Sequence, residues 1–192
     1  RKIVISTGEV TTLAGSGTRT FAEGTGLSAS FDYPTGVTID GTDLYVADRD
    51  NQKIRKIVIS TGVVTTIAGS LGGYYGSTNA TGTSAQFYNP SDITNDGTNL
   101  YVGDSSNNKI RKIVISTGVV TTLAGSGTAG SANDNGTAAS FYYPKGITLA
   151  GTNLYVADGE NNKIRKIVIS EVTETAEFDL HNLDDDFPST PQ

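Results

Sequence analysis

The 192-residue sequence predicts an all-β fold made of consecutive four-stranded antiparallel sheets. The first observation is that the hexapeptide RKIVIS recurs at residues 1–6, 55–60, 111–116 and 165–170, within a longer unit of about 40 residues. The second is that each unit is rich in β-branched residues and is divided by Gly, Asn and Asp, the residues that favour turns. The third is that no segment between these runs shows the apolar spacing of an α-helix.

The unit over residues 31–69 shows the four expected strands in order. The first ends at Asp40-Gly41, a dipeptide that suits the left-handed dihedral angles of a tight turn. A polar loop over residues 48–52 separates the second strand from the third, and Thr61-Gly62 turns the third into the fourth. The expected strands are residues 37–39, 44–47, 54–59 and 63–68.

Four antiparallel strands in about 50 residues match one blade of a β-propeller. A blade packs between neighbours, so its strands carry apolar residues on both faces, as Ile54, Ile57 and Val58 show for the third strand. A β-solenoid is the alternative, although its turns are usually shorter and less like hairpins.

The repeated unit resembles the NHL repeat. The resemblance is carried by P-x-G-[VI]-T, LYVAD, NxKIRKI and TGVVTT[IL]AG, in part over residues 1–14 and then over 31–170. It implies a propeller, six-bladed in its usual form, and the Thr- and Gly-rich blades are similar to NHL proteins of bacterial cell surfaces and secretions. The resemblance thus implies an extracellular or surface location. NHL proteins include RNA binders, interaction platforms, sensors and a few enzymes, so the resemblance leaves the function open.

Counting blades gives about three and a half, with expected bounds near 1–14, 31–69, 87–125 and 141–175 in a domain over residues 1–170. Closed propellers need four to eight blades. The chain begins with Arg1 rather than Met, and we expect a processed or excised piece. Three interpretations stay open: a segment of a longer protein, a ring completed by another copy, or an open array.

The segment over residues 171–192 leaves the repeat and accounts for the net negative charge of the chain. It holds seven acidic residues and no Lys or Arg, whereas residues 1–170 hold 14 basic and 13 acidic residues. We predict that this tail adds strands to a blade edge, with Glu171–Thr173 replacing the missing fourth strand, or docks on basic residues of its own or a neighbouring subunit. A disordered acidic terminus is the alternative. The predicted contact residues are Phe178, Leu180, Asp184, Asp185 and Asp186.

Two sets of charged residues recur in every blade. An Asp after LYVA or LYVG is followed by an Asn three residues later, and we favour turn-building hydrogen bonds over a metal or acid–base site. The second set contains Lys and Arg of the third strands, and it predicts either a polyanion-binding ladder or long stems that cover apolar surface and pair with acidic neighbours. We expect no nucleic-acid partner, because no aromatic ladder accompanies the cations. The sets are Asp48, Asp104 and Asp158 with Asn51, Asn107 and Asn161, and Lys53, Arg55, Lys109, Arg111, Lys163 and Arg165 with Lys56, Lys112 and Lys166.

Aromatic residues precede the first strand of each blade, and we expect them to pack between blades. The connecting loops over 15–30, 70–86 and 126–140 repeat least, so any partner specificity is expected there. Tyr74 and Tyr75 are the predicted contact residues in these loops. The aromatic set is Phe31, Tyr33, Phe87, Tyr88, Phe141, Tyr142 and Tyr143.

Catalysis has little support in the sequence. The chain has no Cys, and His181 in the tail is its one imidazole, so neither a catalytic triad nor a zinc site is expected. Calcium binding by Asp134 or by Asp184 to Asp186 stays open as an alternative, although neither has the spacing of an EF-hand loop. We predict no cofactor, no metal, no membrane span and no enzymatic activity.

The predicted function is a structural or interaction module that associates with copies of itself, as a filament or a multi-chain propeller. The alternative is a recognition domain of a longer surface protein that binds a protein or a glycan through its loops. A hydrolase or lyase is the third reading.

Overall fold

A computed structural model describes residues 1–169, all of them in strands, short 3-10 turns and loops. The predicted tail over 171–192, with its expected contacts Phe178, Leu180 and Asp184 to Asp186, lies outside the described residues. The strands are β1 Lys2–Ile3, β2 Val10–Thr11, β3 Gly24–Thr25, β4 Pro34–Ile39, β5 Asp43–Asp48, β6 Lys53–Val58, β7 Val63–Ala68, β8 Pro90–Asn95, β9 Asn99–Asp104, β10 Lys109–Val114, β11 Val120–Ala124, β12 Pro144–Ala150, β13 Asn153–Asp158 and β14 Lys163–Val168. The 3-10 turns are η1 Gly26–Ser28, η2 Gly82–Ser84, η3 Ser105–Asn107, η4 Gly136–Ala138 and η5 Gly159–Asn161.

The strands form the predicted antiparallel blades. Blade 1 contains β4 to β7, with the short β3 added at its outer edge, and blade 2 contains β8 to β11. Blade 3 contains β12 to β14 and has no fourth strand among residues 1–169. A separate two-stranded hairpin, β1–β2, precedes blade 1. The prediction of an all-β fold made of consecutive antiparallel blades is confirmed.

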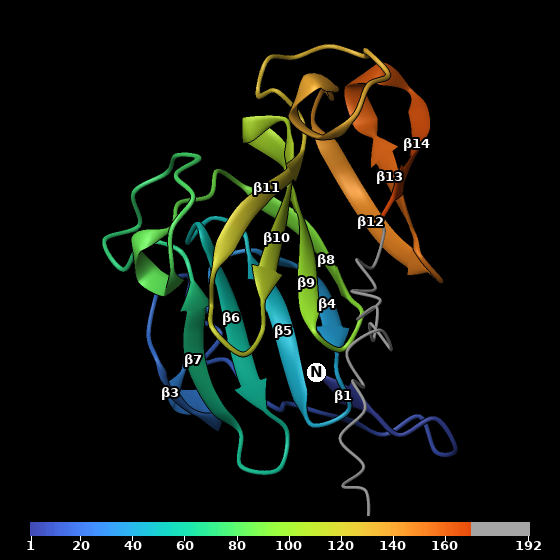
Figure 1. Ribbon diagram of the computed structural model, residues 1–192. Helices are drawn as coiled ribbons and strands as arrows, with labels where there is room; N and C mark the ends of the chain where they lie inside the picture. Colours follow the sequence, from blue (N-terminus) through green and yellow to red (C-terminus); the bar gives the residue numbers. More distant parts are fainter. Residues whose placement is uncertain (170–192) are drawn as a thin grey trace, which may run out of the picture.

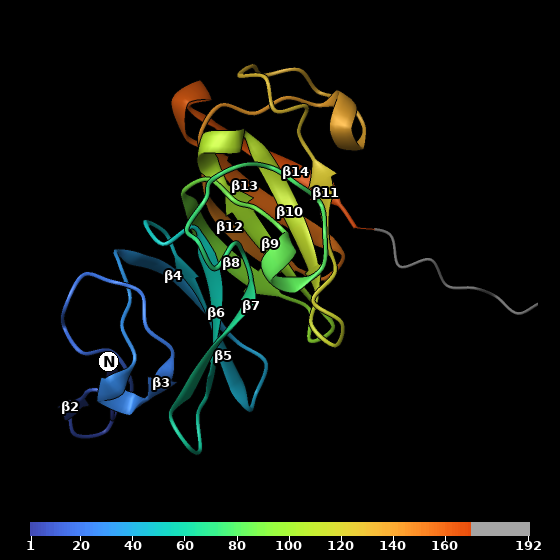
Figure 2. The same ribbon diagram turned by 90° about the vertical axis from the view of Figure 1, so that its left-hand side faces the viewer.

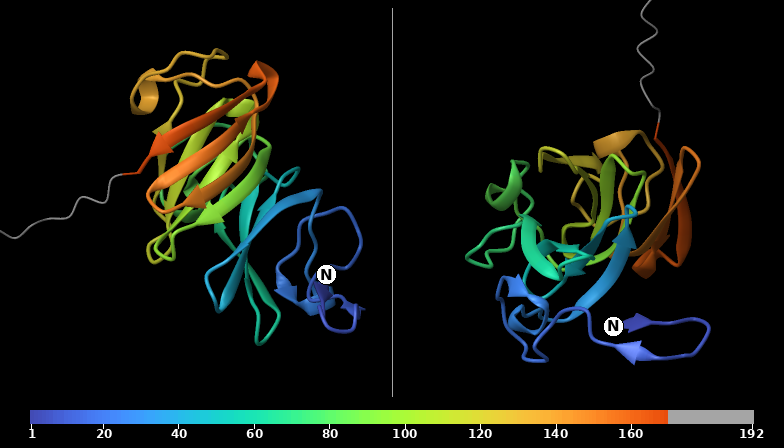
Figure 3. Two further views of the ribbon diagram at one scale, coloured as in Figure 1. Left: turned by 90° about the vertical axis from the view of Figure 1, so that its right-hand side faces the viewer. Right: turned by 90° about the horizontal axis from the view of Figure 1, so that it is seen from below.

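The first strand of each blade lies innermost, with β4 beside β8 and β8 beside β12 (Figure 1). The three sheets follow one another around this inner row, and Figure 3 shows the succession from two further sides. One apolar cluster joins blades 1 and 2, and another joins blades 2 and 3. A third packs Leu13 and Ala14 of the N-terminal segment against blade 1.

The aromatic residues before the first strands divide between core and surface. Phe87 and Phe141 are buried and fill the space between blades, as expected. Tyr33, Tyr142 and Tyr143 are exposed, so the expectation of packing between blades is wrong for these three. Tyr33 and Tyr143 have positive φ angles of 52°, which turn the chain into β4 and β12 and leave the rings at the surface.

Close backbone approach sets how the inner strands meet. A Cβ added to Gly36 of β4 would lie 2.6 Å from Cα of Asp92 in β8, so only glycine fits here. Asp92 in turn accepts a hydrogen bond at Oδ2 from the N–H of Ile147 in β12, at 2.9 Å. A single carboxylate thus links blade 2 to blade 3 at the point where blade 1 also approaches.

Candidate functional site

Each blade contains the same buried ion pair. In blade 2, Asp104 ends β9 and Arg111 lies in β10, and both side chains are fully buried. Arg111 Nη1 donates to Asp104 Oδ2 at 2.9 Å, and Asn107 Nδ2 donates to the same oxygen at 2.8 Å. Asp104 Oδ1 accepts from the N–H of Tyr88 at 2.7 Å. Burial raises the pKa of Asp104, while Arg111 and these hydrogen bonds act in the opposite direction.

The arginine of this cluster also holds the loop that connects two blades. Arg111 donates to the carbonyl oxygens of Gln86 at 2.9 Å and Thr78 at 3.2 Å, and its guanidinium lies 5.2 Å from the ring centroid of Phe87. The cluster recurs as Asp48, Asn51 and Arg55 in blade 1 and as Asp158, Asn161 and Arg165 in blade 3. The Asp and Asn residues do form the expected hydrogen bonds in each blade, but the predicted partners, local backbone amides, are wrong. Each Asp accepts the backbone N–H of a residue 16 positions earlier, together with its Asn and Arg side chains.

The prediction of a basic ladder that a partner can reach is wrong for Lys53, Arg55 and Arg111, which are buried. Arg55 and Arg111 have no exposed surface and lie in ion pairs, so a docking partner cannot reach them. Lys53 is 1% exposed, with Nζ 4.3 Å from the ring centroid of Phe21, and its burial lowers its pKa. Lys109 and Arg165 are partly buried, and Lys163 is exposed at the outer edge of blade 3. The alternative interpretation, in which the cations pair and cover apolar surface, fits these contacts.

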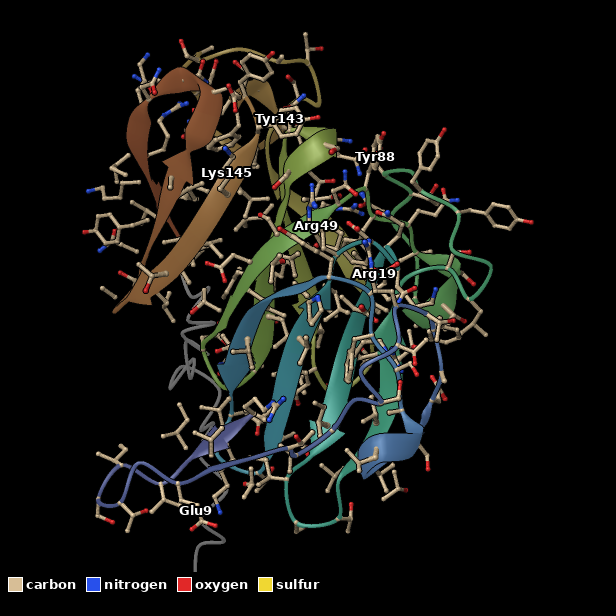
Figure 4. The ribbon with its side chains drawn as sticks, turned by 180° about the vertical axis from the view of Figure 1, so that it is seen from behind. Glu9, Arg19, Arg49, Tyr88, Tyr143 and Lys145 are labelled. Carbon is tan, nitrogen blue, oxygen red and sulfur yellow. The ribbon has the colours of Figure 1, made fainter. Side chains whose placement is uncertain are left out.

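Tyrosines gather on the face of the blades where the first strands begin. Tyr74 and Tyr75 are 70% and 66% exposed in the loop after β7, as the sequence predicted for loop contacts. The ring of Tyr75 stacks on Tyr88 with centroids 4.6 Å apart. Figure 4 places Tyr88, Tyr143 and Lys145 on this face, away from Glu9 at the other end of the molecule. Tyr33 and Tyr142 belong to the same strand beginnings.

Blade 1 with the N-terminal segment lies at one end of the stack and blade 3 at the other (Figure 2). Both ends expose side chains whose equivalents in the other blades are buried. Val37 in β4 is 62% exposed, whereas the equivalent Ile93 and Ile147 are 3% and 6% exposed. At the opposite end Ile164 in β14 is 74% exposed, although Ile54 and Ile110 at the same position are fully buried. A cavity of about 570 Å³ lies along β14, and a smaller one of about 230 Å³ lies beside Val37. The exposure follows from position, because each end lacks the neighbour that covers its interior equivalents.

These end residues were not singled out from the sequence. Their types match buried positions in the other repeats, so residue type alone marks them as core. The available signal was the break in the repeat after residue 170, where TGVVTT does not follow the last KIRKIVIS. Together with the partial blade at 1–14, this break marks the two incomplete blades, whereas the exposure of individual side chains follows only from the structure.

Residues 1–169 contain neither a metal-ligating cluster nor a membrane-spanning helix. Within residues 1–169, no group of three or more His, Cys, Asp or Glu side chains is arranged to hold a metal ion. Asp134 is exposed and accepts the N–H of its neighbour Asn135 at 2.7 Å, and His181 lies outside the described residues. In the same part of the chain, no helix is long and apolar enough to span a bilayer.

Comparison with known proteins identifies the repeat. A family model for the NHL repeat matches residues 31–57. The chain is 31% identical over 156 residues to Protein SUPPRESSOR OF QUENCHING 1, chloroplastic, of Arabidopsis thaliana, covering 75% of this chain and 15% of that protein. It is 35% identical over 105 residues to human NHL repeat-containing protein 2, covering 53% of this chain and 14% of that protein. The chain therefore spans only about one seventh of the length of these two relatives.

Among solved structures, a protein of unknown function from Bacteroides thetaiotaomicron VPI-5482 aligns with a TM-score of 0.67 and 22% identity. The alignment covers 86% of this chain and 41% of that chain. At this level of identity the likeness concerns the fold, and it matches the blade arrangement described above.

Proposed function

We propose that this chain, an NHL-repeat protein folded as consecutive propeller blades, is a protein-interaction module that associates with copies of itself through the two open ends of its blade stack. The proposed role is non-enzymatic, and the proposed location is extracellular or on the cell surface. Assembly into a multi-chain propeller or a filament follows from contacts between unlike ends.

The observation that carries this proposal is the exposure of core positions at both ends. Val37 and Ile164 belong to positions that are buried wherever a neighbouring blade is present. The two ends expose different surfaces of the same repeating unit, one being the face that receives a blade and the other the edge that continues it. Burying them against each other repeats a contact that the molecule already makes twice, between blades 1 and 2 and between blades 2 and 3.

Light scattering over a range of concentrations tests self-association. The mass of the wild-type chain should rise above the 20.0 kDa of one copy as concentration rises. Val37→Asp and Ile164→Asp should each restore the monomer, because a charge in a buried interface is costly. Leu71→Asp is the matched control, since Leu71 is 55% exposed in a loop away from both ends. A wild-type chain that stays monomeric at millimolar concentration would refute the proposal.

A second candidate function rests on the exposed tyrosines. Rigid aromatic side chains on adaptable loops are typical of surfaces that bind proteins or glycans. Tyr74 and Tyr75 lie away from the open ends, so this binding is separable from assembly. Tyr74→Ala with Tyr75→Ala should abolish binding in a screen of soluble oligosaccharides while leaving the mass distribution unchanged. No oligosaccharide binding by the wild-type chain argues against the glycan form of this candidate.

A further inference from the structure

The space beside the outer edge of β14 has the same two boundaries as the position of the fourth strand in the other blades. In blade 1, β7 lies between β6 and the loop segment Gly24–Thr25, which pairs with β7 as β3. In blade 2, β11 lies beside β10, and Thr81 of the preceding loop pairs with Val119. In blade 3, the cavity of about 570 Å³ is lined by β14 on one side and by residues 133–136 of the corresponding loop on the other. Both walls of a fourth-strand position are therefore present.

Hydrogen bonding supports the same equivalence. The N–H of Gly26 donates to Gly62 O at 2.9 Å, and the N–H of Gly82 donates to Gly118 O at 2.8 Å, each acceptor lying in the turn that leads into a fourth strand. Gly136 is the equivalent residue of blade 3. Among residues 1–169, no turn faces Gly136 in the way that Gly62 faces Gly26. The N–H of Gly136 therefore points from this wall of the cavity toward the position of a fourth strand.

Residues 9–15 have the sequence of a fourth strand. EVTTLAG corresponds to VVTTIAG over 63–69 and VVTTLAG over 119–125. The positions that pack inward in β7, Val64 and Ala68, are Val10 and Ala14 here, and the difference from both complete blades, Glu9, falls at a position that is exposed in β7. This segment therefore carries every side chain that a blade requires of its outermost strand.

In the present structure this segment pairs with a short strand whose sequence is repeated in β14. β2 pairs with β1 through two residue pairs, Lys2 with Thr11 and Ile3 with Val10. The RKIVIS of residues 1–6 is identical to residues 165–170, so Lys166 and Ile167 offer the same two partners in the same register. Blade 1 adds two further pairs, Arg55 with Thr66 and Ile54 with Ala68, for which β14 supplies Arg165 and Ile164. A two-stranded hairpin is marginal in water, whereas a strand added to a three-stranded sheet is not.

The backbone of the segment is already shaped for this exchange. Gly15 has a φ of 108°, the value found at Gly69, which ends β7. A Cβ at Gly69 would lie 2.5 Å from Gln52 O, because the start of the third strand crosses there, whereas at Gly15 no backbone atom lies within 4 Å. Gly15 thus keeps the conformation of a residue crossed by a third strand, and Asn162–Lys163 of another chain would supply that crossing.

The chain's own tail is the competing occupant. Residues 171–176 read EVTETA directly after Ser170, so the Thr-Gly dipeptide that turns Ser60 and Ser116 into a fourth strand is absent. At the inward position held by Ile67, the tail has Thr175, and at the position of the strand-ending glycine it has Glu177. Residues 9–15 match the fourth-strand position at each of these points.

We infer that two copies of the chain exchange strands reciprocally: residues 9–15 of each copy leave their pairing with residues 2–3 and become the fourth strand of blade 3 of the other copy. Each copy then contributes three complete blades, and the closed dimer has six, within the range in which propellers close. The exchange buries Ile164 beside Ala14 and covers Val37 with the partner's third blade. This inference rests on the proposed self-association and names the segment that performs it.

Cysteine pairs test the register directly, since the chain has no other thiol. In the variant Thr11→Cys with Lys166→Cys, the strand exchange places the cysteine of one copy opposite the other cysteine of the second copy. Both positions lie on an exposed side of their strands, and residues directly opposite in a sheet are at a separation that suits a disulfide. Mild oxidation should convert most of this variant into a covalent dimer of about 40 kDa, twice the 20.0 kDa of one chain. The matched control is Thr65→Cys with Lys166→Cys, because Thr65 holds the same place in β7 and is already paired with Lys56; it should stay monomeric after denaturation.

Three results would overturn the inference, and they separate it from the proposed function. Self-association without the cross-link between positions 11 and 166 rejects strand exchange and leaves the interaction module standing. A monomeric disulfide in Lys166→Cys with Thr173→Cys shows that the tail fills the position in its own chain. Cross-linked species that grow beyond the dimer reject the closed ring, because an open chain of copies would then be formed.

Discussion

Replacing Asp104 by Asn tests whether the buried ion pairs hold the blades together. The substitution keeps the size of the side chain and an acceptor for the N–H of Tyr88, but it removes the charge that faces Arg111. Both partners are fully buried, and stranding one charge of such a pair costs about 3–5 kcal/mol. With a urea dependence of about 2 kcal/mol/M, the unfolding midpoint should fall by about 2 M.

The assay is urea unfolding followed by tyrosine fluorescence, since the chain has nine Tyr and no Trp. Asp158→Asn should cost less, because its partner Arg165 is 10% exposed and water reaches the stranded charge. The double variant Asp104→Asn with Arg111→Met should recover part of the loss, since it removes the stranded cation as well. Asp134→Asn, at an exposed loop position, is the control. A loss below about 1 kcal/mol for Asp104→Asn would refute the assignment of these pairs as the structural link between loop and blade.

Two further predictions concern packing and pH. Gly36→Ala should destabilise the protein by about 1–3 kcal/mol, because its Cβ meets backbone atoms of Asp92 that cannot move aside. Gly41→Ala is the control for backbone strain, because Gly41 has a φ of 107° and no atom within 4 Å of an added Cβ. Burial raises the pKa of Asp40 and of Asp96, but the hydrogen bonds that the two carboxylates accept outweigh burial and lower both pKa values. The main donors are the Asp43 amide and the Tyr45 hydroxyl for Asp40. For Asp96 they are Tyr101 and Asn99. Because the folded-state pKa of each carboxyl lies below the unfolded value of 3.8, the stabilisation that these two groups provide is present above about pH 4 and is lost as pH falls further. The double variant Asp40→Asn with Asp96→Asn should flatten this part of an acid titration followed by circular dichroism. An unchanged titration curve would contradict the prediction.

The blade architecture was predictable because its signals are local. Turn residues such as Asp40-Gly41 and β-branched runs such as 54–59 recur with the same spacing in each unit, and the bounds of the observed strands differ from the expected ones by a few residues at most. The Asp and Asn residues after the second strand were recognised as hydrogen-bonding residues, but their backbone partners were not local as expected. Asp104 accepts from the N–H of Tyr88, 16 residues earlier, and a contact over that separation depends on the tertiary structure.

The burial of the arginines was not predictable in the same way. Arg55 and Lys56 are neighbours on one strand, yet Arg55 is fully buried and Lys56 is partly exposed beside Asp43. Alternation along a strand places the two on opposite faces, but which face is covered depends on the loop that folds over it from 25 or more residues away. A list of cations in the sequence therefore does not describe a charged surface.

The sequence by itself determined the repeat, the strands and turns of each blade and the buried type of residue at each repeated position, because these depend on interactions between residues close along the chain. Only the tertiary structure decided which copy of a position is covered, since coverage requires a neighbouring blade. Val37 and Ile164 have the side chains of core residues and stand at the two ends of the stack, where no neighbour lies within the described chain. The proposed assembly depends on three blades with an edge at one end that no residue of 1–169 fills and a spare strand at the other.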